Sequence, residues 1–588
     1  MKKRFLSLMF AATLAMSLTA CGKSANTNTS TNGAFKAGTY EGTANGFGGE
    51  IKATVTLSEN AIDSIEVVGD KETQGIGSVA VEQLPGDMVK KQAVEIDGIS
   101  GASVSSAAIK EAVTVALKKA GVDASSLVPI EDSATEVKKE TLDVDVVVVG
   151  AGGAGMTAAI QSKEAGMNVV IVEKAAYAGG NTSRATGGMN AAETKLQNEL
   201  QIEDTVETFI QDTMEGGYNI NNLALVTKMC EESSNAIDWL ASIGAPLPEL
   251  SFSGGATFKR IHRPEGGVGV GAFLVNAFSD KIEELDIPVY YNTTATKILM
   301  DGEKAVGILA ESKEANYTIN AKSVIIATGG FGANEELYTK YKPELEGYVT
   351  TNVPTATGDG ITMATNVGAN TVDMEQVQIH PTVDQSTSLL ITESVRGDGA
   401  ILVNQSGVRF GDELRTRDVV SASIIEQEGS YAYLVFDQQL RDELSAVEKY
   451  IENGIVTQAD SLEELASAIG MDPATLSDTV TRWNAAVASQ NDEEFGRNTG
   501  MEHDISVGPF YAIKIAPGVH HTMGGLEINT EAEVISTEGK AIPGLFAAGE
   551  VAGGIHGGNR IGGTAITDIV VYGRVAGMSA SEYVSNLK

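Results

Sequence analysis

The chain has 588 residues, of which 42% are hydrophobic, and its mean hydropathy of −0.02 is close to neutral. This length exceeds what a single hydrophobic core usually serves, so we expect two or three globular domains of α/β character. The 78 acidic side chains outnumber the 42 basic ones and give a net charge of −36, which argues against nucleic acid as a partner because two polyanions repel each other.

The first residues predict an export signal rather than part of the fold. Three basic residues at positions 2–4 precede an apolar run over 5–20, which is too short to span a bilayer comfortably. The run ends at Cys21, a pattern typical of a bacterial lipoprotein signal in which the cysteine carries the lipid. We therefore expect residues 1–21 to be the signal, with Cys21 lipidated and the protein anchored to the cell membrane on its extracytoplasmic face. The alternative is an ordinary secretory signal that contains a cysteine by chance.

Cysteine content limits the metal chemistry of the chain. Apart from Cys21 the sequence contains only Cys230, so neither an internal disulfide nor a cysteine-rich metal site can form in the mature chain. A Cys-x-x-Cys-His motif is absent from the sequence, which excludes a c-type haem. We therefore predict no metal site.

A small domain is expected next to the signal. Residues 22–34 are small and polar and predict a flexible stalk. Residues 35–121 predict an α+β domain, because apolar residues alternate with a period of two over 51–57 and a helix is expected over about 104–120. Residues 122–141 mix Ser, Pro and charged residues and predict a linker.

The segment 97–105 (Asp-Gly-Ile-Ser-Gly-Ala-Ser-Val-Ser) places Ser103 where the helix should begin. A helix N-terminus stabilises a phosphate through free N–H groups and the helix dipole. The segment resembles the flavinylation motif of FMN-binding domains in bacterial redox pumps and extracytoplasmic reductases. The resemblance implies that a flavin transferase joins FMN covalently to the Ser103 hydroxyl. Residues 72–77 (Glu-Thr-Gln-Gly-Ile-Gly) resemble that family's Glu-Thr-Pro-Gly loop, although Gln74 replaces the usual proline. The alternative is that Ser100 and Ser103 only cap a helix.

A dinucleotide-binding pattern begins after the linker. Residues 145–149 predict a buried strand that enters the glycine turn 150–155 and then a helix, and Glu173 ends the next strand, 18 residues after Gly155. The glycines allow the pyrophosphate to approach, and the glutamate can accept hydrogen bonds from the ribose hydroxyls. The pattern alone does not distinguish FAD from NAD. The predicted contacts are Gly150, Gly152, Gly153, Ala154, Gly155, Glu173 and Lys174.

Three later segments favour FAD, bound without a covalent bond. They are GGNTSRATGGMN (179–190), VIIATGG (324–330) and IPGLFAAGE (542–550), in the order found in flavoproteins whose isoalloxazine ring lies against the first of them. The predicted contacts are Gly180, Asn181, Thr182, Ala185, Gly187, Gly188, Ala327, Thr328, Gly329, Gly549, Glu550, Ala565 and Ile566.

A further set of segments carries a family resemblance. The segments that carry it are, in chain order, GGNTSRATGGMN, KRIHRPEGGVGVGA, HPT, ITESVRGDGAILVN, TRD, GVHHTMGG and GGIHGGNRIGG. Together they resemble the flavoprotein subunit of soluble fumarate reductases, within the succinate dehydrogenase and fumarate reductase family. The resemblance implies a Rossmann-type FAD domain over 142–372 and 519–588, with an α+β capping domain inserted over 373–518. The FMN-binding domain, in front of these, would deliver electrons to FAD in place of the family's haem domain.

The same resemblance implies how a small dicarboxylate, most simply fumarate, is held. His521 and Arg560 match residues that grip one carboxylate, and His380 with Thr392 and Glu393 matches those that grip the other. Backbone near the substrate would come from Gly562 and Gly563. Arginine and histidine suit this task because they hold and polarise carboxylates. Leu390 stands where a methionine is familiar in fumarate-specific relatives.

The resemblance also implies the reaction. FAD N5 would give hydride to the double bond of fumarate, Arg417 would give the proton, and Glu393 and Arg396 would relay protons from solvent, yielding succinate. The developing negative charge needs fixed positive groups around it. The alternative for Arg417 is that it only clamps a carboxylate.

Other polar residues are expected to have structural roles. His262, His503, His520 and His556 are each interpreted as simple hydrogen-bonding residues, and the acidic residues near 193–204 as a solvated helix face.

Other functions remain open. One is a reductase of another 2-enoate such as urocanate or methacrylate, and another is an electron-relay flavoprotein without its own substrate. An oxidase is possible by fold, but the FMN module argues against it. The electron donor is expected to be a membrane component of unidentified nature, because the sequence contains no second nucleotide fold for NADH.

Overall fold

The computed structural model describes residues 35–587 apart from 73–76, 100, 131–136 and 253. The predicted signal, the lipidation site Cys21, the stalk, Ser100, part of the linker and most of the Glu-Thr-Gln-Gly loop therefore lie outside the described residues. Among the helices that the structure describes, none combines the length and apolar character that a membrane crossing requires.

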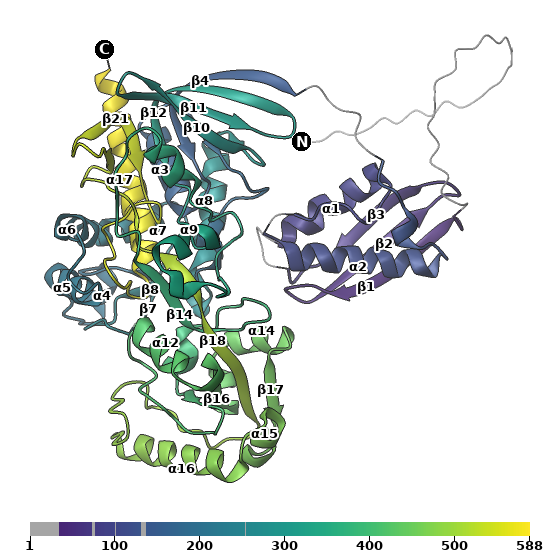
Figure 1. The fold of residues 1–588 in the computed structure, drawn as a ribbon, viewed down its shortest axis with the longest axis vertical. Helices are drawn as coiled ribbons and strands as arrows, with labels where there is room; N and C mark the ends of the chain where they lie inside the picture. Colours follow the sequence, from purple (N-terminus) through teal and green to yellow (C-terminus); the bar gives the residue numbers. More distant parts are fainter. Residues whose placement is uncertain (1–34, 73–76, 100, 131–136, 253, 588) are drawn as a thin grey trace, which may run out of the picture.

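The FMN-binding domain predicted over 35–121 is an α+β unit, drawn in purple and blue in Figure 1. Its antiparallel sheet has the order β1 (Gly38–Asn45), β2 (Glu50–Leu57), β3 (Ile62–Val68). Helices α1 (Gly77–Lys91) and α2 (Ser103–Lys119) pack on this sheet, and η1 (Ala124–Ser126) follows them. Alternate residues of β2, Ile51, Ala53, Val55 and Leu57, are buried beneath the helices, which confirms the predicted strand.

A larger sheet forms the centre of the FAD part, by which we mean residues 142–372 and 519–587. Its order is β10 (Thr294–Asp301), β11 (Lys304–Glu311), β12 (Ala315–Ile326), β4 (Lys138–Val149), β5 (Val169–Val172), β9 (Val289–Tyr290), and β21 (Ala541–Ala547) also pairs with β12 and with β20 (Glu533–Ile535). The pairs among β12, β4, β5, β9 and β21 are parallel. Parallel strands are covered on both faces, which explains the unbroken valine run that ends β4.

Two of these strands extend beyond their predicted bounds. β4 begins at Lys138, inside the predicted linker, because residues 138–143 continue the parallel ladder along β12 from Ala315. β12 in turn begins well before the predicted start at Val324. Backbone pairing with a neighbouring strand overrides the polar character of residues 138–141, which a local reading of the sequence cannot foresee.

Helices α3 (Gly153–Glu164) and α17 (Thr564–Asn586) pack against each other beside this sheet (Figure 1). The other elements of the FAD part are η2 (Gly180–Arg184), β6 (Met189–Asn190), α4 (Lys195–Glu199), α5 (Val206–Gly216), α6 (Leu223–Glu231), α7 (Ser233–Ser242), β7 (Glu249–Ser251), β8 (Ile261–Arg263), η3 (Glu265–Gly267), α8 (Val270–Glu284), α9 (Glu335–Tyr341), η4 (Pro343–Leu345), α10 (Asp359–Thr365), β13 (Thr371–Val372) and β19 (Gly525–Leu526).

The acidic stretch 193–204 is only partly the solvated face that was predicted. Glu199 and Glu203 are exposed, but Asp204 is buried and its carboxylate lies 2.8 Å from the Arg260 guanidinium. Arg260 also pairs with Asp212 at 2.9 Å. A buried carboxylate needs such a partner, and the partner lies 56 residues further along the chain.

The inserted cap, residues 373–518, has its own sheet in the order β14 (Val377–Val383), β18 (Phe510–Thr522), β16 (Ala432–Asp437), β15 (Ile401–Val403), with β17 (Val456–Ala459) also on β18. Its helices are α11 (Glu393–Gly397), α12 (Arg417–Ile425), η5 (Glu428–Ser430), α13 (Gln438–Glu443), α14 (Ala446–Glu452), α15 (Leu462–Ile469) and α16 (Pro473–Ser489). The chain enters and leaves the cap at one place, because β13 pairs with β19. The predicted domain boundaries themselves stay a prediction.

Candidate functional site

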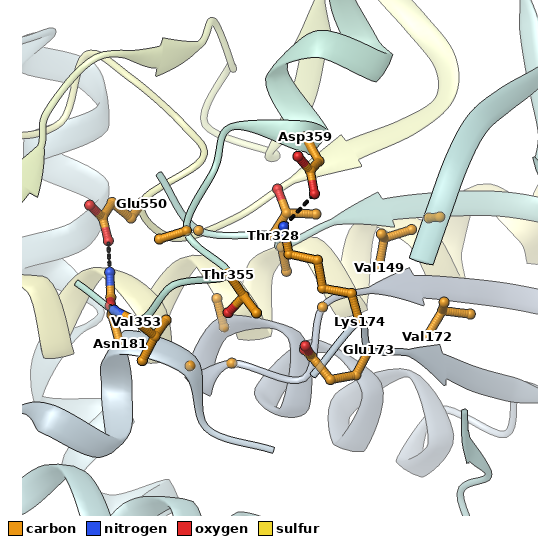
Figure 2. A pocket seen from close by; sticks show the side chains of 18 of the residues that line it. Val149, Val172, Glu173, Lys174, Asn181, Thr328, Val353, Thr355, Asp359 and Glu550 are labelled. Atoms are coloured by element: carbon orange, nitrogen blue, oxygen red, sulfur yellow. Dashed lines mark hydrogen bonds and ion pairs between the residues drawn. The ribbon is translucent and has the colours of Figure 1, made fainter. Parts of the chain in front are cut away.

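A cavity with an atom-free volume of about 830 Å³ opens along the carboxyl ends of β4, β5 and β12 (Figure 2). Ligands of open parallel sheets bind at this edge. The predicted FAD contacts that line the cavity are Gly150, Gly152, Gly153, Ala154, Glu173, Lys174, Gly180, Asn181, Thr182, Ala327, Thr328, Gly329 and Glu550. The structure thus brings together segments that are up to 400 residues apart in the sequence.

The glycine turn is shaped by close backbone contacts. Gly150 has a φ of +106°, and a Cβ atom there would come within 2.4 Å of the Ala327 carbonyl oxygen. A Cβ atom on Gly155 would come within 1.9 Å of the Gly150 carbonyl oxygen. Gly152 caps α3 without a side-chain hydrogen bond of its own, and the Gly153 N–H donates to the Thr182 hydroxyl at 3.1 Å. A helix N-terminus at this place attracts a pyrophosphate. The turn therefore fits the cofactor predicted from its sequence.

Glu173 and Lys174 lie in the cavity beside the turn (Figure 2). The Glu173 carboxylate accepts hydrogen bonds of 2.7 Å from the backbone N–H groups of Ala151 and Ala175. Burial raises the pKa of Glu173, although these two donors oppose the shift. The remaining lone pairs of the carboxylate can accept from ribose hydroxyls. Lys174 donates to Asp359 at 2.5 Å.

Asn181 and Glu550 lie together at another place in the cavity (Figure 2). The Asn181 amide donates to Glu550 at 3.2 Å, and Glu550 also accepts from the Thr522 backbone N–H at 3.0 Å. The other face of Glu550 approaches His521, with 3.5 Å between its Oε1 and the imidazole Nδ1. Burial raises the pKa of Glu550. This carboxylate therefore joins the cavity to a second cluster.

Some predicted FAD contacts do not line the cavity. These are Gly155, Ala185, Gly187, Gly188, Gly549, Ala565 and Ile566. Gly155 and Gly188 allow close packing instead, because a Cβ atom on either would meet a backbone oxygen within 2.3 Å. The cavity has further lining residues that were not among the predicted contacts, which are Val149, Val172, Thr293, Thr294, Ala295, Val353, Thr355, Ala356, Asp359, Met363, Ala548 and Ile569.

The second cluster brings together the predicted catalytic residues. The Arg417 Nε donates to Glu393 Oε1 at 2.6 Å, and Arg396 lies 3.8 Å from the same oxygen. Burial alone would raise the pKa of Glu393, but the charges of Arg417 and Arg396 outweigh it and hold this pKa at about 2. Glu393 is therefore a carboxylate held between two guanidinium groups.

A buried ionic network within the cap holds Arg396 in place. Its guanidinium donates to the Glu413 backbone oxygen, and its own carbonyl accepts from Arg497 at 2.8 Å. The Glu413 carboxylate pairs with Arg409 at 2.9 Å and with Arg497 at 3.1 Å. Both arginines lie within 5 Å of the Trp483 ring centre, at 4.7 and 4.6 Å. A paired and packed network of this kind holds its members in one geometry.

Gln378 connects the cap to the FAD part and was not predicted. Its carbonyl oxygen accepts from Arg417 at 3.0 Å, while its amide donates to Asn559 at 2.7 Å and to the Arg560 carbonyl oxygen at 2.9 Å. In the ladder between β14 and β18 it is paired with His521. The sequence did contain a signal for Gln378, because this residue lies two positions before His380 and so shares its face of the strand.

The gripping residues leave unsatisfied polar atoms in this cluster. His380 Nε2, His521 Nε2 and Arg560 Nε are buried and have no hydrogen-bond partner among the described residues. Such atoms are costly unless a ligand meets them. Thr392 precedes Glu393 as the cap of α11, and Gly563 caps α17 next to Gly562, whose oxygen accepts from Asn190 at 2.8 Å.

Burial controls the charge of the same residues. Burial, reinforced by the Arg417 charge, lowers the pKa of Arg560 to about 9. Burial and neighbouring arginine charges also lower the pKa values of His380, His520 and His521 well below the ordinary value. The histidines are thus neutral at pH 7, and the arginines carry the positive charge that attracts an anion.

The other histidines are held by local contacts. His262 lies 2.9 Å from the Thr194 hydroxyl, and burial lowers its pKa to about 4. His503 lies on the cap surface beside Glu443 at 3.0 Å. His520 contacts the Thr351 hydroxyl at 2.8 Å, and its ring also packs edge-on against His380. His556 pairs with Asp568 at 3.3 Å, and its ring packs against that of His521.

Ser103 is the exposed first residue of α2. The preceding Ala102 caps the helix, and no described side chain makes a cap hydrogen bond there, so the first N–H groups of this helix suit a phosphate. Ser103 is not the cap residue of the helix, and Ser100, the other serine of the capping alternative, lies outside the described residues. The chemistry of the site fits a flavin phosphate.

Known proteins share both halves of this arrangement. Residues 145–566 match the model of an FAD binding domain, and residues 46–118 match that of an FMN-binding domain. The chain is 44% identical to an NADH:fumarate oxidoreductase from Klebsiella pneumoniae over 93% of this chain and 59% of the relative, so it spans less than two thirds of that relative's length. It is 37% identical to a urocanate reductase from Eggerthella lenta over 92% of either chain. A solved flavocytochrome c3 fumarate reductase in an open conformation gives a TM-score of 0.67 at 44% identity, covering 76% of this chain and 79% of that one.

The matched FAD binding domain and the glycine turn at the cavity make this chain an FAD-dependent oxidoreductase, of the class that acts on CH–CH bonds. Within that class it belongs to the family of fumarate reductase flavoproteins, with an FMN-binding domain preceding the FAD domain. The family resemblance and the α/β fold class predicted from the sequence are confirmed.

Replacing Glu173 with alanine should lower the affinity for FAD by about tenfold or more, because hydrogen bonds to a charged group contribute about 1.5–3 kcal/mol each. The measurement is the dissociation constant of FAD, from titration of the apoprotein followed by flavin fluorescence. Glu164→Ala, on the exposed end of α3, is the matched control and should bind FAD normally. An unchanged affinity in Glu173→Ala would contradict the assigned ribose contact.

Proposed function

We propose that the protein reduces the double bond of fumarate to give succinate. The observation that carries this proposal is the convergence of Arg417, Arg560, His380 and His521 around unsatisfied buried atoms, at the end of the flavin cavity marked by Glu550. A dicarboxylate supplies two anionic ends for such a cluster. The relatives named for fumarate reduction support the same choice.

Each residue of the cluster has a separate role in the proposed reaction. Arg560 and His521 face one carboxylate, and His380 with the α11 cap at Thr392 faces the other. Bound FAD supplies hydride chemistry at one face of the alkene. Arg417 gives a proton from the opposite face and recovers one through Glu393 and Arg396, which lie within 3.8 Å of each other. The buried positive charge stabilises the anion that develops on the substrate.

The cap controls access to this site. Gln378 of the cap bonds directly to Asn559 and Arg560 of the FAD part, so the cap lies closed on the FAD part here. The solved relative described above adopts an open conformation. We infer that the cap opens to admit substrate and closes to exclude water, which strengthens the electrostatic interactions inside.

The remaining parts of the proposal concern electron supply and location. FMN, joined covalently to Ser103 by a flavin transferase, relays electrons to FAD from a membrane donor. Lipidation of Cys21 anchors the protein on the extracytoplasmic face of the membrane. The exposed serine at an uncapped helix start supports the first statement, and the sequence pattern at 1–21 supports the second.

Urocanate reduction is the second candidate. It is favoured by the urocanate reductase that matches 92% of this chain, including the FMN-binding domain. The retained His380, Thr392 and His521 favour a dicarboxylate instead.

Steady-state assays of the holoprotein with a reduced dye should give the highest kcat/KM on fumarate among fumarate, urocanate, methacrylate and acrylate. Two carboxylates satisfy both gripping groups, whereas the other substrates leave one group unpaired. Absorbance of the dye measures the rate. A higher kcat/KM on urocanate than on fumarate would refute the proposed substrate.

Arg417→Gln should lower kcat for fumarate by about 10²–10⁴-fold, because this is the usual contribution of a positioned proton donor. Dye-driven kcat and KM are measured separately, and the affinity for succinate is measured by perturbation of the flavin spectrum. A clamp without a role in proton transfer predicts the reverse pattern, in which KM rises while kcat is retained.

Ser103→Ala should abolish covalent flavin fluorescence of the denatured chain while retaining FAD. Turnover with electrons from membranes should be lost, whereas turnover with a dye that reduces FAD directly should be retained. Thr114→Ala, further along α2 and away from the motif, is the control and should keep the covalent flavin. Equal losses with both donors would contradict the relay role.

A further inference from the structure

One end of the FMN-binding domain contacts the cap at α14. The ammonium group of Lys449 lies 4.6 Å from the centre of the Phe47 ring, which is part of the turn between β1 and β2. Three residues further along α14, Glu452 pairs with Lys71 at 3.4 Å. The second pair is exposed and contributes little, so the cation over the aromatic ring is the stronger contact.

The same end of the domain contacts the FAD part. Gly101, with a φ of +82°, packs so closely on Tyr177 that a Cβ atom there would come within 1.7 Å of the tyrosine hydroxyl oxygen. Tyr177 is buried and lies between Glu173 and Gly180, two residues that line the FAD cavity. The FMN-binding domain therefore bridges the cap and the FAD part.

This end also carries the proposed attachment site. The buried Glu72 carboxylate accepts from the Gly48 backbone N–H at 3.0 Å and from the Ser105 hydroxyl at 2.5 Å. It thereby ties the turn that holds Phe47 to the start of α2, where Ser103 is exposed. The contacts with the other two parts and the flavin attachment residue thus belong to one rigid surface.

Helix α14 is in turn tied to the substrate site. The Tyr450 hydroxyl, next to Lys449, accepts a hydrogen bond of 2.9 Å from the backbone N–H of Thr392. Tyr450 also packs in one hydrophobic cluster with Ile391 and Val395, on either side of the start of α11. A shift of α11, which carries Glu393, therefore moves α14 with it.

We propose that α14 is a docking element through which closure of the cap over substrate fixes the FMN-binding domain beside FAD. The rigid end of that domain can contact α14 and Tyr177 together only in one orientation of the cap. That orientation is the closed one, because Gln378 bonds to Arg560 in the same structure. A ligand that bridges the cap and the FAD part therefore favours docking.

This inference rests on the proposed relay of electrons from FMN to FAD. A chemical reductant such as dithionite first reduces FMN. Reduced FMN then passes two electrons to FAD for each alkene that is reduced, and the accompanying protons exchange with solvent. Because docking of the FMN-binding domain is coupled to closure of the cap, the electrons pass to FAD when substrate is bound.

Docking is tested by cross-linking the full-length holoprotein. In the variant Lys71→Cys/Glu452→Cys, a short bismaleimide should link the two positions, and succinate should raise the initial cross-linking rate. The control Lys118→Cys/Glu452→Cys should not link, because Lys118 lies at the far end of α2, about 22 Å from Ser103 at 1.5 Å per residue. Neither native cysteine competes, because Cys230 is buried and the Cys21 thiol is consumed by the proposed lipidation. A rate that succinate leaves unchanged would overturn the coupling.

Two further variants separate docking from coupling. Lys449→Glu should slow FMN-to-FAD electron transfer, followed by stopped-flow absorbance, by about fivefold or more, since a cation over a ring contributes about 1 kcal/mol. Lys118→Glu makes the same charge change at the far end and should transfer normally. In the cross-linking variant, Tyr450→Phe should keep basal linking but lose the response to succinate.

The outcomes also separate this inference from the proposed function. Without dye-driven fumarate reduction in the unaltered protein, the proposed function fails. If that activity is present but Lys449→Glu transfers electrons at the normal rate, the docking element alone is wrong.

Discussion

Buried guanidinium groups held close together define the candidate substrate site. Arg396 and Arg417 meet at the Glu393 carboxylate, and the charge of Arg560 interacts with both Glu393 and Glu550. Burial, together with the Arg417 charge, lowers the pKa of Arg560, so a guanidinium at this position is costly and is tolerated because the remainder of the protein holds it in place. Positive groups fixed in this way suit a site that binds an anion.

Two features of the surrounding structure hold the buried arginines in place. Within the cap, Arg409 and Arg497 are neutralised by Glu413 and Asp492, and both arginines pack on Trp483, so this network holds α11 in place. Between cap and FAD part, Gln378 makes its bonds with neutral groups that add no further charge to be compensated. Arg396 thus has a rigid support within the cap.

Motif-bearing residues could be predicted from the sequence, whereas residues defined by tertiary contact could not. The glycine turn and Glu173 follow from local backbone geometry and fixed spacing, and the structure places both at the cavity. The arginines and histidines of the second cluster carried a family pattern, and the structure brings them together. Gln378, Asn559 and Tyr450 are common neutral side chains whose roles come from partners between 39 and 181 residues away. For the same reason Asp204 was assigned to the surface, since its charge predicts exposure and its burial depends on hydrogen bonds from Arg260 and Gln197.

The continuity of β18 limits how specificity in this fold can be redesigned. One strand runs from Phe510 inside the cap to Thr522 beside the flavin cavity, and its ladder with β14 passes from Val519 to His521, which leaves His520 as the extra residue of an irregularity. A register slip in this strand would move both imidazoles away from their present partners. A cap transplanted from a relative should therefore be joined outside the β13–β19 pair, so that the transplanted segment brings its own ladder and leaves the histidine register intact.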